Sequence, residues 1–246
     1  MSSKIALIIS GALRNYETGK LAHHIWGDVD KHVVTWESTS SDLDGYASSI
    51  GAKSATAVQD KNFLLESKHR HNGFRMVYLW SHAISMFKND YDKLIIIRPD
   101  AFHWTENINE IRNQIEQCYS VTTNTNTNPE NKYLLSDHVV IVDKTFFHRI
   151  EELFLRCTTI YDSCKDRKPD IHELLNLVLG DIPGIKNDAV ARCVETVFIR
   201  NTFKALSSDE YNYVLYRSIF YDSASWWRRE KRSRYHGGLR PEHCCE

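Results

Sequence analysis

The sequence lacks the cysteine patterns that indicate zinc sites or redox motifs. Its six cysteines form no CxxC pair and no spacing that combines with histidines to bind zinc. Such cysteine usage fits a reduced compartment. A long apolar run is also missing at the start, where MSSKIALIIS contains only six apolar residues. We therefore expect neither a signal peptide nor a transmembrane segment, and a cytoplasmic protein of viral or cellular origin.

Phosphate-binding signatures and a strong overall charge are missing as well. Neither GxGxxG nor GxxxxGK[ST] occurs, and a formal net charge of −1 names no partner. With 42% hydrophobic residues, the chain can nevertheless bury a substantial core. Nothing between the periodic segments has the composition of a flexible linker. We expect one domain over residues 1–225, followed by a basic aromatic tail over residues 226–246.

The strongest strand signal lies in KLIIIRPDAFHW, residues 93–104. Its apolar run at 94–97 is too short for a buried helix and predicts a central parallel strand, covered on both faces. Pro99 cannot donate to a sheet ladder, so the strand should end at about Arg98. Arg98 and Asp100 would then lie together at the carboxyl edge of the sheet, where open α/β sheets bind ligands.

These two side chains have two interpretations. A carboxylate at this edge can hold a divalent cation, and Mg²⁺ usually keeps waters and substrate phosphates as its other ligands. Asp100 with Arg98 would thus suit a diphosphate. Alternatively, the two side chains pair with each other and only cap the loop.

The remaining patterns predict alternating strands and helices, hence an α/β fold with a Rossmann-type, mostly parallel central sheet and helices on both faces. Apolar runs and periodicities predict strands at 5–9, 33–36, 55–58 and 190–200, and helices at 17–30, 72–87, 107–118, 145–159 and after Pro169. The polar stretch 122–130 indicates a surface loop. The stretch 133–142 is interrupted at Asp137, which fits two short strands around an acidic turn or one continuous strand.

Four segments together resemble a group of GT-A-fold glycosyltransferase-like proteins of viruses, phages and bacteria. They are KIALIISGALRNYE at the start, YDKLIIIRPDAF around the central strand, LLSDHVVIVDKTFF, and IHELLNLVLGDIPGI. They follow one another in the family's order over roughly residues 4–185. The chain departs from the family pattern at RPD, which has a single acidic residue where a full DxD has two.

This resemblance implies transfer of a sugar from a nucleotide-sugar donor to an acceptor hydroxyl, on a glycan or a lipid-linked glycan. Asp100 would stand in for the DxD motif and hold Mn²⁺ or Mg²⁺, and Asp137 is the candidate base for the acceptor hydroxyl. The residues implied to bind the donor are Ser10, Gly11, Arg14, Asn15 and Tyr16 in the first loop, Thr35 and Trp36 beside the nucleoside, and Arg75 and Arg98 near the phosphates. Asp137 has a structural alternative as a turn residue, and for Arg75 a solvent position fits equally well.

Two other functions remain open at this point. A non-catalytic module that binds nucleotides or glycans would also fit, because the second acid of DxD is missing. The tail WWRREKRSRYHGGLR carries six basic residues and one Glu. Its tryptophans and arginines suit stacking and phosphate contacts, so a phage-type DNA glycosyltransferase acting on modified bases is the second alternative.

Overall fold

The structure is a computed structural model that describes residues 3–13, 26, 28–66, 72–99, 101–104, 113, 115–117, 121–127, 133–182 and 195–198. The strands are β1 Ile5–Ser10, β2 Asp30–Trp36, β3 Ser54–Val58, β4 Lys93–Ile97, β5 Ala101–Trp104, β6 Val121–Thr127, β7 Tyr133–Asp143 and β8 Glu195–Phe198. The helices are α2 Leu43–Ser49, α3 Asp60–Glu66, α4 Asn72–Phe87, α6 Phe147–Glu151, α7 Leu153–Ser163 and α8 Ile171–Leu179, with short 3-10 turns at Glu37–Thr39 and Lys144–Phe146.

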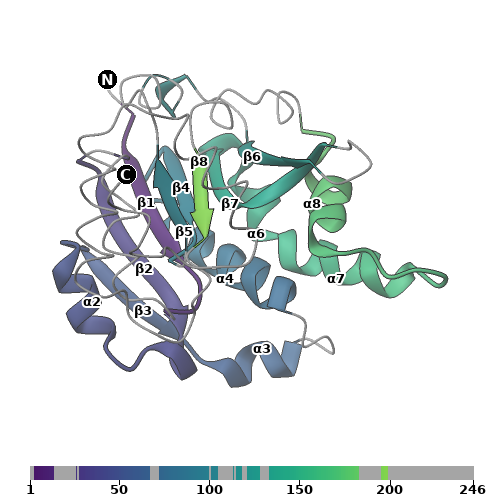
Figure 1. The fold of residues 1–246 in the computed structure, drawn as a ribbon, viewed down its shortest axis with the longest axis horizontal. Coiled ribbons are helices and arrows are strands. Elements are labelled where there is room, and N and C mark those ends of the chain that lie inside the picture. The colour runs from purple at the N-terminus through teal and green to yellow at the C-terminus, as the bar shows by residue number, and fades with distance from the viewer. Residues whose placement is uncertain are drawn as a thin grey trace, which may run out of the picture.

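One six-stranded sheet forms the centre of the fold, in the order β3-β2-β1-β4-β7-β6 (Figure 1). β1 pairs in parallel with β2 and β4, and β2 pairs in parallel with β3. β7 runs the other way and pairs antiparallel with both β4 and β6. The predicted α/β class and mostly parallel sheet are confirmed.

Apolar side chains cover both faces of this sheet, which explains the unbroken apolar runs of β1 and β4. On one face, Ile8 and Ile96 pack in a cluster with residues of α4, α6, α7 and α8. On the other face, Leu7 and Ile95 pack with Tyr46 of α2. Helix α4 has the bounds that its periodicity predicted, 72–87. Among the residues described above, no helix has the length and apolar content needed to cross a bilayer.

Two predictions from the sequence are wrong. The stretch 122–130 was expected to be a loop, but residues 121–127 form β6, because β7 supplies the pairing partner that a Thr- and Asn-rich segment needs. Helix 145–159 is divided into a 3-10 turn, α6 and α7, with a break at Glu152, where ψ is −4°. Of the two alternatives left open for 133–142, the structure shows the continuous strand. Most of the helix predicted at 17–30, most of 107–118 and the whole tail 226–246 lie outside the described residues, and Asp30 already belongs to β2.

A buried chain of polar side chains lies at the amino end of β2. The His32 ring has Nδ1 2.7 Å from Ser54 Oγ and Nε2 2.8 Å from the Tyr91 hydroxyl. Tyr91 in turn donates to Asp30 Oδ2 at 2.8 Å. Burial lowers the pKa of His32, and burial together with Asp30 raises the pKa of Tyr91 to about 12. This chain of hydrogen bonds fixes the end of the sheet opposite the candidate site.

Candidate functional site

The carboxyl ends of β1, β2 and β4 lie side by side because these strands run in parallel. Their register pairs Ser10 with Val34 and Ile9 with Ile97. The segments that leave this edge are therefore the loop after Ser10, the turn after Trp36 and the loop after Ile97. Ligands of open α/β sheets bind at such an edge, and we call it the carboxyl edge.

The loop after β1 begins with a buried polar group and a glycine. Ser10 is 1% exposed, and its Oγ has no hydrogen-bond partner among the described residues. Gly11 has φ +146°, a conformation that side chains rarely adopt, and its N–H donates to the Val34 carbonyl at 3.1 Å. A Cβ at Gly11 would lie 2.9 Å from Pro99 Cδ. The loops after β1 and β4 are thus packed directly against each other.

The loop after β4 carries the predicted cation ligand. Arg98 is half-buried and Pro99 is buried. Asp100 lies outside the described residues, between Pro99 and Ala101, where β5 begins. β5 pairs antiparallel with β8 in a separate two-stranded sheet. In the described part of the chain, no three His, Cys, Asp or Glu side chains gather closely enough to hold a metal ion.

Asp137 lies in an irregular part of β7. Thr123 of β6 pairs with Val140, and Thr125 pairs with Leu135. A step of two residues along β6 therefore corresponds to a step of five residues along β7. The last pair between β4 and β7 is Ile97 with Val139, which places the backbone of Asp137 two residues beyond the end of β4. The interruption seen in the sequence is therefore a bulge at the carboxyl edge. Bulges are frequent next to active sites, where they re-aim side chains.

Helix α8 holds the strand next to this bulge. Among the described strands, none pairs with β7 on that side beyond the end of β4. Instead, the Leu135 carbonyl lies 3.0 Å from His172 Nδ1, and its N–H donates to Asn176 Oδ1 at 3.3 Å. Helix α8 is itself fixed by a capping box, in which Asp170 accepts from the Glu173 N–H and Glu173 accepts from the Asp170 N–H. The sequence showed α8 but gave no sign that its polar side chains bind β7.

The turn after β2 is arranged differently from the expectation for Trp36 and Arg75. The Trp36 ring is 3% exposed and packs against Phe63 and Tyr78, so it offers a bound nucleoside no free face. Arg75 is paired with Asp60 at the start of α3, and its Cζ lies 4.3 Å from the centre of the Trp36 ring. Thr35 is buried, and its Oγ1 lies 3.2 Å from Thr39 Oγ1.

The remaining predicted donor residues, Arg14, Asn15 and Tyr16, lie outside the described residues. Of the predicted set, the structure brings Ser10, Gly11, Thr35 and Arg98 to the carboxyl edge through their strands. Asp60 was missed by sequence reasoning. The only signal in the sequence was its place before a short apolar segment, which fits many helix starts.

A hollow of about 220 Å³ lies between the start of α4, the end of α7 and the start of α8. It is lined by Phe74, Tyr161, Arg167, Lys168, Pro169, Asp170, Ile171 and Leu174. Its volume is below the range of roughly 300–1,000 Å³ usual for ligand pockets. We therefore place the candidate site at the carboxyl edge, where the polar groups converge.

Comparisons with known proteins give remote structural similarities. No family model and no curated protein sequence matches the chain. It is similar to a glycosyltransferase involved in glycosylation of the major capsid of PBCV-1, with 15% identity over 80% of this chain and 94% of the other and a TM-score of 0.45. It is also similar to core-mannan synthase A from Aspergillus fumigatus in a Mn/GDP form, with 11% identity over 80% and 75% and a TM-score of 0.49.

A third similar structure is 4-diphosphocytidyl-2C-methyl-D-erythritol synthase from Anaerococcus prevotii, with 10% identity over 72% of this chain and 84% of the other and a TM-score of 0.43. These proteins catalyse different reactions. Similarities this remote do not assign an activity to the chain.

Proposed function

We propose that the chain is a glycosyltransferase that moves a sugar from a nucleotide-sugar donor to an acceptor hydroxyl. The observation that carries this proposal is the convergence at the carboxyl edge. There the buried Ser10 hydroxyl, which has no partner among the described residues, and Gly11 pack against the loop that leads into Asp100. The bulge of β7 brings the backbone of Asp137 to the same edge. The ordered sequence motifs supply the reaction class.

The residues at this edge fit a nucleoside diphosphate group. Because Gly11 has no side chain, the Pro99 ring packs directly against its backbone and holds the loops after β1 and β4 together. The Ser10 hydroxyl can donate a hydrogen bond, and Arg98 supplies positive charge beside the diphosphate. Asp100 would hold Mn²⁺ or Mg²⁺, which neutralises the negative charge on the diphosphate leaving group. Asp137 would accept the proton of the acceptor hydroxyl.

The test begins with the unmodified chain. A thermal-shift panel of nucleotide sugars, with and without Mn²⁺, should identify the donor, since a ligand at 100 times its dissociation constant adds about 2.7 kcal/mol of stability. Slow hydrolysis of that donor without an acceptor should follow. A binding module would show the thermal shift but no hydrolysis, so this result separates the two functions.

Two substitutions then assign the roles. Asp100→Asn should abolish metal-dependent donor binding, whereas Asp137→Asn should lower turnover far more than donor affinity. Asp166→Asn is the matched control, because Asp166 is an exposed carboxylate in the loop between α7 and α8. If Asp100→Asn binds the donor as tightly as the unmodified chain, measured by calorimetry with the metal present, Asp100 is not the cation ligand. Equal losses of binding and turnover in Asp137→Asn would return that residue to a structural role.

A further inference from the structure

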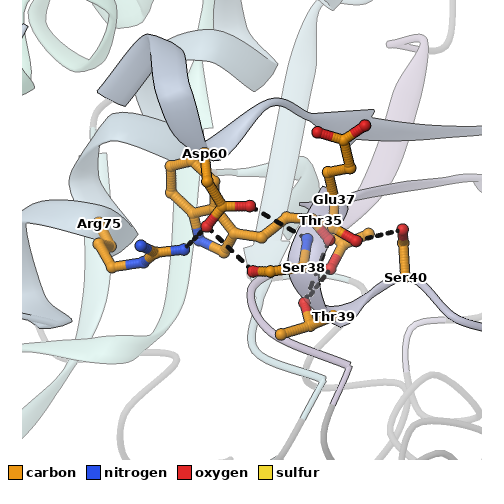
Figure 2. Close-up of polar contacts among 8 residues, drawn as sticks. Thr35, Glu37, Ser38, Thr39, Ser40, Asp60 and Arg75 are labelled. Carbon is orange, nitrogen blue, oxygen red and sulfur yellow. Dashed lines mark hydrogen bonds and ion pairs between the residues drawn. The ribbon is translucent and has the colours of Figure 1, made fainter. Parts of the chain in front are cut away.

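The turn after β2 is tied to two helices through a single carboxylate. Asp60 Oδ2 accepts from the Ser38 N–H at 3.0 Å, and Asp60 Oδ1 accepts from the Ser38 hydroxyl at 3.0 Å. Oδ1 also accepts from Arg75 Nη2 (Figure 2). The three partners come from different elements, since Ser38 follows β2, Asp60 begins α3 and Arg75 lies on α4. We call Ser38, Asp60 and Arg75 the clamp.

Arg75 anchors the clamp on the core, whereas Ser38 at the other end of the clamp is exposed. The Arg75 guanidinium lies over the Trp36 ring at 4.3 Å and near the Phe63 ring at 5.6 Å. Both rings are buried. Burial by itself would raise the pKa of Asp60, but hydrogen bonds from Arg75 and Ser38 outweigh it and lower the pKa. The carboxylate therefore stays ionised and the clamp stays closed at neutral pH.

Further hydrogen bonds within the turn restrict its conformation once the clamp is formed. Thr39 Oγ1 donates to the Trp36 carbonyl at 3.3 Å, and Ser40 Oγ donates to the Glu37 carbonyl at 2.8 Å. Figure 2 shows the Glu37 side chain pointing away from the clamp. The turn adjoins the loop after β1, because Gly11 bonds to Val34, two residues before the end of β2. What the clamp fixes is thus a border of the carboxyl edge.

We propose that Asp60 and Arg75 are positioning residues, which hold the turn at 37–40 in the shape that binds the nucleoside part of the donor. This inference rests on the proposed function. It gives Arg75 a role through Asp60 and the turn, in place of the direct phosphate contact expected from the sequence. Ordering the turn before binding lowers the entropy cost of binding. Release of the clamp should therefore weaken nucleotide affinity while the chain stays folded.

The chain offers a closely matched control carboxylate, Glu151, which contacts the other end of α4. Glu151 of α6 accepts from Lys88 Nζ at 2.7 Å and from Ser85 Oγ at 2.7 Å. It thus also joins a cation and a serine hydroxyl, but it holds the far end of α4 rather than the turn. Its side chain is 30% exposed, close to the 24% of Asp60. Glu151→Ala removes a comparable set of contacts without touching the carboxyl edge.

The experiment measures calorimetric binding of UDP and of GDP, each with MnCl₂, and hydrogen exchange of the peptide that covers residues 37–40. Asp60→Ala should lower the affinity for the nucleotide about tenfold, equivalent to about 1.4 kcal/mol. It should also accelerate hydrogen exchange in that peptide. Asp60→Asn keeps an acceptor for Ser38 and should restore part of the affinity. Glu151→Ala should change neither readout.

The possible failures are distinguishable. If Asp60→Ala accelerates exchange but binds nucleotide as tightly as the unmodified chain, the positioning role is wrong and the proposed function stands. If the unmodified chain binds neither of these nucleotides nor any nucleotide sugar of the thermal-shift panel, the proposed function fails and this inference fails with it. Should Asp60→Ala unfold, Asp60→Asn carries the test, and affinity equal to that of the unmodified chain refutes the role.

Discussion

Replacing Gly11 by alanine tests whether the loops after β1 and β4 are locked together. The new Cβ would lie 2.9 Å from Pro99 Cδ and 3.4 Å from Pro99 Cγ, on a backbone with φ +146°. The unfavourable φ costs about 1–3 kcal/mol, and overpacking against a buried proline adds about 1–3 kcal/mol. A gain of about 0.4–1 kcal/mol from the less flexible unfolded chain offsets part of this. We expect Gly11→Ala to lower the free energy of unfolding by about 2–5 kcal/mol.

Gly51→Ala separates the two contributions. Gly51 also has a positive φ, +65°, but nothing lies within 4 Å of the position of its Cβ. This control should therefore lose only about 1–2 kcal/mol from its left-handed backbone. Urea denaturation followed by far-UV circular dichroism gives both values, provided the dependence on urea concentration is unchanged.

A double mutant identifies the contact itself. In Gly11→Ala/Pro99→Ala the ring that the new methyl group meets is absent, so the overpacking part of the loss should disappear while the φ part remains. A coupling energy of about 1 kcal/mol or more is expected for two residues in direct contact. Strict additivity of the two single substitutions, or a Gly11→Ala loss no greater than that of Gly51→Ala, would refute the locked arrangement.

Two further predictions concern stability away from the site. Burial lowers the pKa of His32 below 6.5 in the folded chain. Just below that pH, the unfolded chain therefore binds more protons than the folded chain. Stability should be full above about pH 6.5 and fall as the pH drops toward the pKa of the folded chain. Urea titrations at several pH values should show a shallower acid loss in His32→Gln than in the unmodified chain; identical slopes for the two proteins would contradict the assignment. Asp170→Ala should cost about 1 kcal/mol by removing the capping box of α8, and a midpoint equal to that of Asp166→Ala would argue against the cap.

The sequence predicted the elements whose signal is local. The 72–87 helix followed from apolar residues at helical spacing, and the strands at the start and centre followed from unbroken β-branched and aliphatic runs. Pro169 indicated in the same local way that a helix follows it, and α8 begins at Ile171. In each case the residues that determine the structure lie within a few turns or one strand of each other.

Predictions failed where the deciding partner is distant in the chain. TTNTNT has the composition of a loop, and it becomes a strand because β7 offers it a ladder of hydrogen bonds. Asp137 interrupts an apolar run in the sequence, and only pairing with β4 and β6 shows that this interruption is a bulge at the carboxyl edge. For Arg75 the sequence left open a place near the phosphates and a solvent position, whereas packing brings Asp60 and the Trp36 ring to it.

The sequence by itself therefore determined the α/β class, the main strands and helices, and the strand ends at which Ser10 and Arg98 lie. Local propensity and hydrophobic period suffice for these features, because they depend on near neighbours. Tertiary structure alone decided that Gly11 lies against Pro99, that Trp36 belongs to the core, and that Asp60 joins β2, α3 and α4. These contacts join residues 15 to 88 positions apart, and they form only when parallel strands and their crossover helices bring the carboxyl ends of the strands together.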